Sequence, residues 1–265
     1  PAPIEYIVPI KTSVVYGTPY AEALNKLPNR AWVRFGDGAE GYMDITWDTN
    51  PSGYDGSVSA KYKIYGTLSS DLFLTNGTER VVAEVNVLEK IDPIESGETV
   101  LYQYMPYEDQ LHMGYILQTK TGKLIVVDGG WVQSGGPDQG LFSELKRISG
   151  TDHPVVDAWF LTHIHADHVS EFIRIANENA ENITVKNIYA HFPTQEQVYK
   201  LEPPQGNDDL YERFVSAFDT FMGEGAYDAY QPVERGDVIV VDDIIIEILQ
   251  VPNGSEPSIN DTSMP

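Results

Sequence analysis

Seven consecutive residues, Thr162-His163-Ile164-His165-Ala166-Asp167-His168, constrain this chain more than any other feature of its sequence. Histidine and aspartate fill cores poorly, so three imidazoles and a carboxylate at this density are hard to explain by packing alone. The same side chains are the usual protein ligands of divalent transition metals. A simpler interpretation, a solvated polar turn whose histidines bind nothing, requires chance to supply all four residues in this order. The cluster therefore predicts a metal site.

The flanking residues indicate where this cluster lies in the fold. Val155–Leu161 is mostly apolar and β-prone, which is typical of a strand buried on both faces. From Phe172 to Ile183, apolar residues recur at helical spacing. We therefore expect the cluster in a loop between a strand and a helix, at the carboxyl end of the strand, where open α/β layers place their sites.

The order of the four residues resembles the His-x-His-x-Asp-His signature of the metallo-β-lactamase superfamily. The resemblance implies that His163 and His165 bind a first metal ion, and that Asp167 and His168 bind a second. It also implies hydrolysis by metal-activated water, with Asp167 in a catalytic role, and two divalent ions. Imidazole and carboxylate ligands together suit zinc, with manganese or iron as alternatives.

Residues 100–265 show further similarity to that superfamily and its αββα fold. Met113–Thr119 and Leu124–Val127 predict a hairpin across Lys120-Thr121-Gly122-Lys123, and Asp128-Gly129-Gly130 resembles the family's Asp-Gly-Gly turn. In the family this aspartate accepts a hydrogen bond from behind the metal histidines and fixes their tautomer, so we predict that role for Asp128. Asp-Gly is also a common turn pair, so a plain turn residue is the alternative interpretation.

The same region leaves part of the site unassigned. Asn260-Asp261-Thr262-Ser263 resembles a segment of two branches of the superfamily, the phosphorylcholine-esterase-like and the competence-protein-like groups. In both, a bridging aspartate and a last metal histidine follow that segment, so the predicted αββα domain is expected to be incomplete at its carboxyl end. His191, at the end of a strand predicted over Ile183–Ala190, and His112, beside the predicted hairpin, are candidate cleft residues.

Residues 1–92 have a different, all-β pattern. Short β-prone runs alternate with turn-rich stretches, beginning with a strand predicted over Ile4–Ile10, and several such strands suggest a β-sandwich. The region resembles bacterial Ig-like modules of secreted and surface proteins. That resemblance rests on Val15-Tyr16-Gly17-Thr18, Leu27-Pro28, Asp44-Ile45-Thr46-Trp47-Asp48 and Tyr65-Gly66-Thr67-Leu68, with Trp47 expected to pack between sheets. Asp92-Pro93 and Gly97 mark a linker between the two predicted domains.

Composition narrows the function further. The 265 residues carry a formal net charge of −23, which disfavours binding to nucleic acid or to anionic membrane surfaces. The chain contains no cysteine, so histidines and carboxylates are its only strong metal ligands, and it has no apolar stretch of membrane-spanning length. It also lacks a Gly-x-Ser-x-Gly nucleophile motif and a phosphate-binding Gly-x-x-x-x-Gly-Lys loop.

These features predict a secreted or cell-surface, metal-dependent hydrolase with an Ig-like sandwich before its catalytic domain. The expected substrate is a phosphodiester, either a small molecule or one attached to the cell wall. The alternative is a non-catalytic surface or adhesion protein in which the Ig-like module is the working part.

Overall fold

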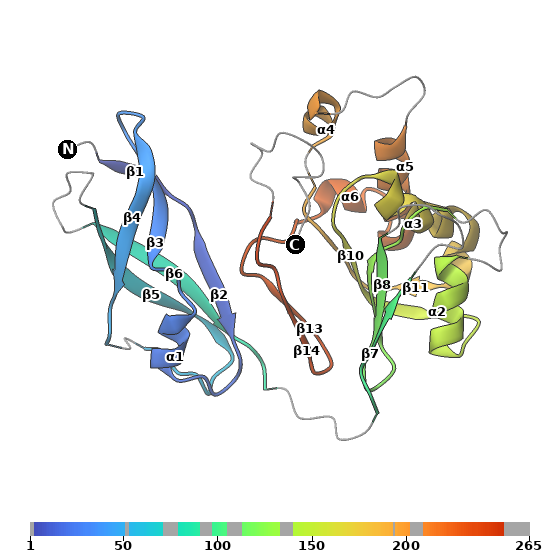
Figure 1. Ribbon diagram of the computed structural model, residues 1–265, viewed down its shortest axis with the longest axis horizontal. Coiled ribbons are helices and arrows are strands. Elements are labelled where there is room, and N and C mark those ends of the chain that lie inside the picture. The colour runs from blue at the N-terminus through green and yellow to red at the C-terminus, as the bar shows by residue number, and fades with distance from the viewer. Residues whose placement is uncertain are drawn as a thin grey trace. The chain divides into compact units, whose positions relative to one another are not determined.

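The computed structural model describes residues 3–50, 53–70, 79–90, 97–104, 113–132, 140–192, 194–201 and 209–251 (Figure 1). The chain divides into two compact units. Unit 1 comprises Pro1–Asp92 with Arg235–Val238, and unit 2 comprises Pro93–Glu234 with Ile239–Pro265. Asp92 and Pro93 of the predicted linker lie outside the described residues.

Unit 1 is built on one six-stranded sheet with the order β1-β3-β4-β5-β6-β2. Among its described strands, β2 pairs with β6 in parallel, and the pairs β1–β3, β3–β4, β4–β5 and β5–β6 are antiparallel. The elements of this unit are β1 (Ile4–Ile7), β2 (Ile10–Val14), α1 (Tyr20–Asn25), β3 (Arg30–Phe35), β4 (Glu40–Trp47), β5 (Ala60–Ser69) and β6 (Arg80–Val87).

The sheet of unit 1 curls around its core. β1 and β2 are separated by two residues in sequence but occupy opposite edges of the sheet, so those edges must approach one another. Residues alternate between buried and exposed along β3 and β6, and Val33, Met43 and Leu68 are fully buried. Trp47 packs against this core, and its indole Nε1 donates a hydrogen bond to the Pro28 carbonyl at 2.9 Å. The unit is strand-rich, as expected, and its assignment as an Ig-like sandwich stays a prediction.

The strand predicted over Ile4–Ile10 is wrong in its extent. The structure has two strands here, β1 and β2, with Val8 and Pro9 between them. Proline has no amide hydrogen to donate to a ladder, so a break at Pro9 is physically reasonable. The break lets the chain cross from one edge of the sheet to the other.

Unit 2 contains a sheet with the order β11-β10-β9-β8-β7, and β12 also pairs with β10. β7, β8 and β9 are antiparallel, whereas β9, β11 and β12 are each parallel to β10. The strands are β7 (Val100–Gln103), β8 (Gly114–Gln118), β9 (Leu124–Asp128), β10 (Val155–Leu161), β11 (Thr184–Val185) and β12 (Ile188–Ala190). The helices are α2 (Leu141–Ser149), α3 (Ala166–Asn179), the 3-10 turn Ala180–Asn182, α4 (Gln195–Leu201), α5 (Leu210–Met222) and α6 (Ala226–Ala229).

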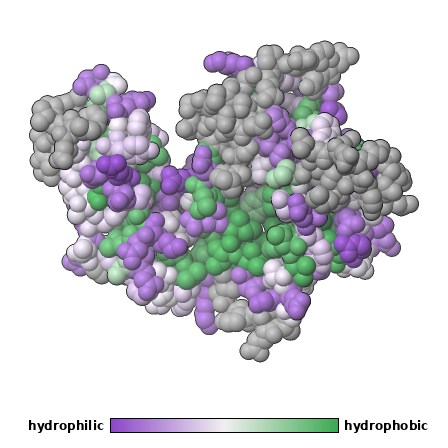
Figure 2. Space-filling model, viewed as in Figure 1, coloured by the Kyte–Doolittle hydropathy of each residue, from purple (hydrophilic) through white to green (hydrophobic). Residues whose placement is uncertain are grey.

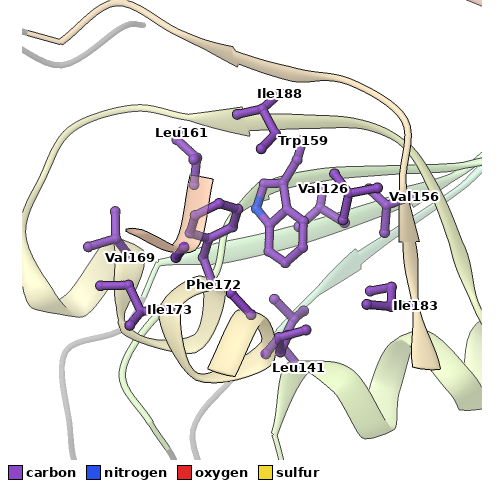
Figure 3. Packing of buried hydrophobic residues seen from close by; sticks show 14 of the residues in the cluster. Val126, Leu141, Val156, Trp159, Leu161, Val169, Phe172, Ile173, Ile183 and Ile188 are labelled. Carbon is purple, nitrogen blue, oxygen red and sulfur yellow. The ribbon is translucent and has the colours of Figure 1, made fainter. Parts of the chain in front are cut away.

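Helices cover one face of this sheet. Side chains from α2, α3 and α5 pack with Val126, Val156 and Trp159 of the sheet in the largest buried apolar cluster (Figure 3). Trp159 and Phe172 are fully buried and meet edge to face at 5.1 Å between ring centroids. This packing holds α3 against the carboxyl half of β10.

A hairpin covers the opposite face of the same sheet. It consists of β13 (Val238–Val241) and β14 (Ile244–Glu247), and its inward side chains pack on Ile125, Ala158 and Phe160. β10 is therefore buried on both faces, as its sequence predicts. The described residues supply a helix layer, a central sheet and a hairpin layer, and the full αββα arrangement stays a prediction.

The two hairpin tips of unit 2 are joined by charged and polar contacts. Asp242, in the β13–β14 turn, has a positive φ of 55° and pairs with Lys123 Nζ at 2.6 Å. It also accepts hydrogen bonds from the hydroxyls of Thr119 and Thr121, while Lys120 pairs with Asp243 at 2.9 Å. These contacts fix the turn over the end of the β8–β9 hairpin.

Apolar side chains remain accessible on the outer side of β13 and β14. Val240 of β13 and Ile245 of β14 are exposed, as is Leu249 just after β14, and apolar residues gather on the face of the molecule seen in Figure 2. Among the helices that the structure describes, none combines the length and apolar character needed to cross a membrane.

Candidate metal centre

The predicted metal ligands lie where β10 ends and α3 begins. β10 ends at Leu161, and His165, in an extended conformation, occupies the position immediately before α3. The His165 carbonyl accepts hydrogen bonds from the amides of His168 at 2.9 Å and Val169 at 3.0 Å, which starts the helix. His163 and His165 lie in the loop, as expected from the sequence, whereas Asp167 and His168 already belong to the first turn of α3, which begins earlier than predicted.

The Asp128-Gly129-Gly130 turn docks against the first turns of the same helix. The amides of Gly129 and Gly130 donate to the His168 carbonyl at 2.7 and 3.1 Å, and the Glu171 amide donates to the Gly130 carbonyl at 3.0 Å. A side chain at Gly129 would place its Cβ 3.2 Å from the Phe172 nitrogen and 3.3 Å from the Glu171 Cβ. Glycine therefore permits the close approach that brings the end of β9 to α3.

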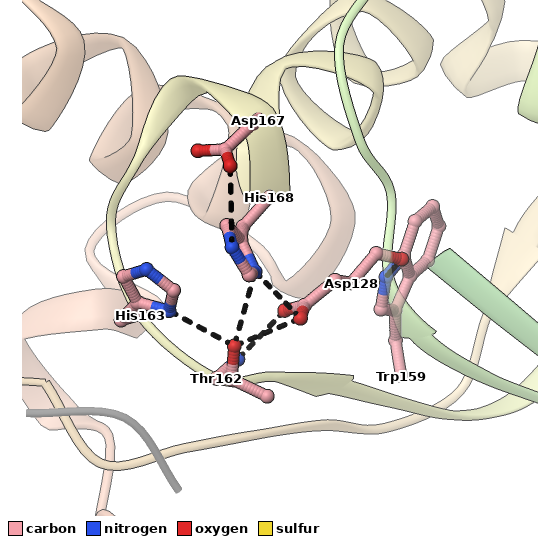
Figure 4. Close-up of polar contacts among 6 residues, drawn as sticks. All are labelled: Asp128, Trp159, Thr162, His163, Asp167 and His168. Atoms are coloured by element: carbon pink, nitrogen blue, oxygen red, sulfur yellow. Dashed lines mark hydrogen bonds and ion pairs between the residues drawn. The ribbon is translucent and has the colours of Figure 1, made fainter. Parts of the chain in front are cut away.

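Asp128 is the centre of a buried hydrogen-bond network behind the histidines (Figure 4). Its Oδ1 accepts from the Thr162 amide at 2.8 Å. Its Oδ2 accepts from the Thr162 hydroxyl and from His168 Nδ1, each at 2.8 Å. The indole Nε1 of Trp159 donates to the Asp128 carbonyl at 3.1 Å, and Asp128 has a positive φ of 55°. The carbonyl of this residue is thus bound by β10, and its carboxylate is bound by Thr162 and His168, which follow that strand.

The acceptor at Asp128 determines which nitrogen of His168 carries the proton. An ionised carboxylate only accepts hydrogen bonds, so His168 Nδ1 must be the protonated nitrogen of a neutral ring. Its Nε2 then has the lone pair that a metal ion needs. Asp128 therefore accepts a hydrogen bond from His168 Nδ1, and its role behind a metal ligand stays a prediction.

Three imidazoles lie in ring contact at this site. The His163 ring centroid is 3.8 Å from that of His168 and 4.8 Å from that of His165. Burial first, and then the nearby His168 and His165 rings, lower the pKa of His163 to about 4, so its ring is neutral at pH 7. Asp167 Oδ2 lies 3.6 Å from His168 Nε2. Imidazoles beside a carboxylate are the donor set of a zinc-type site.

The four side chains are close together, but they do not surround a common point. Among the described residues, no three histidine, aspartate or glutamate side chains are grouped so that they could hold a metal ion. The identity and tautomers of the donors fit a metal ion, whereas their arrangement is not that of a complete coordination sphere. The assignment of His163, His165, Asp167 and His168 as ligands therefore stays a prediction.

Of the two candidate cleft histidines, His191 lies within the described residues. His191 follows β12, whose Ala190 pairs with Leu161, so it lies at the same sheet edge as Thr162. Its Nδ1 donates to the Val233 carbonyl at 2.6 Å, which leaves Nε2 as its accepting nitrogen. His112, like residues 259–264, lies outside the described residues.

Thr162 and Trp159 belong to this network, but the sequence alone predicts no role for either. Thr162 directly precedes the histidines, and its hydroxyl, common at turns, was a usable signal. Trp159 reads as an apolar strand residue, and its bond to Asp128 depends on the register of β9 against β10, where Val126 pairs with Trp159. That register is a tertiary property that the local sequence does not carry.

Comparison with known proteins places unit 2 in a family. A family model described as the metallo-beta-lactamase superfamily matches residues 111–252, more than half of the chain. This match confirms the superfamily predicted from the His-rich motif. No curated protein matches the chain.

Proposed function

The chain belongs to the metallo-beta-lactamase superfamily, and on this basis we propose that it is a secreted, metal-dependent hydrolase of phosphodiesters. Most members of the superfamily are hydrolases, and they typically bind divalent metals. The observation that carries the proposal is the network in which Asp128 orients His168 beside His163 and His165.

The residues of the site would have different roles in such a reaction. His163 and His165 would hold one divalent ion, Asp167 and His168 a second, and zinc suits these ligands best, with manganese or iron as alternatives. Bound metal ions supply a water of lowered pKa and stabilise negative charge on a phosphoryl oxygen. Asp128 holds His168 in the tautomer that offers Nε2, and burial keeps the His163 ring neutral and ready to coordinate.

The proposed substrate class follows from the charge and composition of the chain. A net charge of −23 opposes association with long polyanions, which supports a small or cell-wall-attached phosphodiester over nucleic acid. With no cysteine and no Gly-x-Ser-x-Gly motif, activated water is the nucleophile that best fits this chain. The proposed secreted or cell-surface location depends on the resemblance of residues 1–92 to Ig-like modules.

One observation favours a second candidate function. Since no three ligand side chains of the described residues are grouped around a metal position, unit 2 can be a domain that does not retain metal. The protein would then be a non-catalytic surface or adhesion protein in which the Ig-like module is the working part.

Metal analysis tests both candidates. The protein is incubated with zinc or manganese, dialysed, and assayed for bound metal per chain and for hydrolysis of bis(p-nitrophenyl) phosphate. The variant H163A/H165A removes two predicted ligands, and His153→Ala is its matched control because His153 is exposed and bonds to Thr184 Oγ1 at 3.0 Å. We expect at least one metal ion per chain and turnover in the wild type and the control, with both reduced in the double variant.

Less than one equivalent of metal in the wild type would contradict the hydrolase proposal and favour the adhesion protein. Equal metal content and equal rates in the wild type and H163A/H165A would show that the assigned residues are not the site.

A further inference from the structure

Thr162 connects two histidines that the superfamily motif assigns to different metal ions. Its hydroxyl oxygen lies 2.8 Å from Asp128 Oδ2, 3.1 Å from His163 Nδ1 and 3.3 Å from His168 Nδ1. Its amide donates to Asp128 Oδ1 at 2.8 Å. Two bonds to one carboxylate thus fix the position of the residue that lies between the two rings.

The direction of each bond follows from the number of protons available. A threonine hydroxyl has one hydrogen and two lone pairs, while the Asp128 carboxylate can only accept. Two oxygens at 2.8 Å in a buried site require a hydrogen between them, so the Thr162 hydroxyl donates to Asp128. The hydroxyl oxygen is then an acceptor toward the rings, and His163 Nδ1 must be the donor to it.

We propose that Thr162 is a positioning residue that links Asp128 to His163 through its hydroxyl. The Asp128 carboxylate would then set the tautomers of two histidines, His168 directly and His163 through Thr162, and these two histidines belong to different predicted metal positions. His168 is held directly through its 2.8 Å bond to Asp128, and His163 is held through the Thr162 hydroxyl. Both rings carry the proton on Nδ1 and present Nε2. The two tautomers follow from the hydrogen bonds alone, whether or not metal binds. Only the assignment of the two histidines to two metal positions rests on the proposed function.

This arrangement makes the two histidines unequal in their dependence on Thr162. His168 has a shorter bond to Asp128 than to the Thr162 hydroxyl, 2.8 against 3.3 Å, so it keeps its main acceptor when that hydroxyl is removed. The bond from His163 Nδ1 to Thr162 ends with the hydroxyl. Loss of the hydroxyl should therefore release the tautomer of His163 and leave that of His168 in place.

Nitrogen NMR of the metal-free protein at pH 8 tests this inference, because the ring nitrogens of neutral histidines report which of them is protonated. In the wild type we expect protonated Nδ1 and unprotonated Nε2 at both His163 and His168. Thr162→Val removes the hydroxyl but keeps the branched side chain and the amide bond to Asp128, and Thr162→Ser, which keeps the hydroxyl, is its matched control. We expect mixed tautomers at His163 in T162V alone, with His168 unchanged in both variants.

Three results would overturn the proposal. The first is a proton on Nε2 of His163 in the wild type, a measurement that depends on no variant. The second is an unchanged His163 tautomer in a folded T162V protein. The third is an equal change of that tautomer in T162V and T162S.

Zinc titration of the same three proteins addresses the metal part. We expect binding about 10- to 100-fold weaker in T162V and near wild type in T162S, the range found when partners of metal histidines are removed. Wild-type affinity in T162V would overturn the link to metal. If the wild type itself binds no zinc, the proposed function fails, while the tautomer result still decides the relay.

Discussion

Replacing Trp159 with phenylalanine tests whether the core controls the geometry of the site. Trp159 is fully buried, and its indole donates to the Asp128 carbonyl at 3.1 Å. The substitution leaves that buried carbonyl without this donor, at a cost of about 1–3 kcal/mol. It also removes three ring atoms from the core, at about 2 kcal/mol in total. We expect unit 2 to lose about 3–5 kcal/mol of unfolding free energy, a fall in its melting temperature on the order of 10 °C.

The same substitution should also weaken metal binding, since the indole bond helps to hold Asp128 at a φ of 55°. We expect about a tenfold loss of zinc affinity, near the lower end of the effects seen for residues that support metal histidines. Calorimetric unfolding gives the first quantity and zinc titration the second.

Phe172→Leu is the control for packing. Phe172 is equally buried and contacts Trp159 edge to face, but its side chain has no hydrogen-bonding group. It should lower the melting temperature and leave zinc affinity near that of the wild type. Wild-type zinc affinity in Trp159→Phe, or equal losses of affinity in the two variants, would refute the link from Trp159 through Asp128 to the histidines.

Two further substitutions test individual carboxylates. Asparagine tolerates the positive φ of residue 128, but Asp128→Asn places an amide where three hydrogen-bond donors converge. Zinc affinity measured by titration should therefore fall about 10- to 100-fold. An unchanged affinity would contradict the role of the carboxylate charge. Burial alone would raise the pKa of Asp242, but hydrogen bonds from Lys123, Thr119 and Thr121 hold it below its ordinary value of 3.8. The charged form of Asp242 therefore stabilises the fold above pH 3.8, and this contribution is lost as the pH falls below 3.8. The melting temperature of Asp242→Asn should lie furthest below that of the wild type at neutral pH, and the difference should shrink below pH 3.8. A difference that does not change with pH would contradict the pairing.

The sequence predicted those parts of unit 2 that depend on local pattern. β10, the loop at His163 and helix α3 follow from an apolar run, a polar cluster and helical spacing in direct succession. The β8–β9 hairpin was predicted in the same way. The strand predicted over Ile183–Ala190 is instead two short strands, because the Asn187 carbonyl between them accepts from the Trp159 amide and its side chain donates to the Asp157 carbonyl. Those partners lie in another strand, so no local pattern could indicate the break.

The same distinction explains what was missed in unit 1. Helix α1, Tyr20–Asn25, was not predicted, because it has only six residues and lies among β-prone segments. Pro19 precedes it, and the amides of Glu22 and Ala23 both donate to the Pro19 carbonyl. A helix this short depends on burial of Ala23 in the core more than on its own sequence.

The residues behind the predicted ligands form a continuous hydrogen-bond network. The side chains of Asp128, Thr162 and His168 are hydrogen-bonded to one another, so the network does not need a metal for its own stability. The low pKa of His163 keeps its ring neutral at pH 7, so its centroid can lie 3.8 Å from that of His168 without repulsion between two charged rings. Among the described residues no three donor side chains are grouped so that they could hold a metal ion, so the assignment of His163, His165, Asp167 and His168 as ligands stays a prediction. If these side chains do bind metal, a supporting network that its own hydrogen bonds already hold in place favours binding with little reorganisation of the fold.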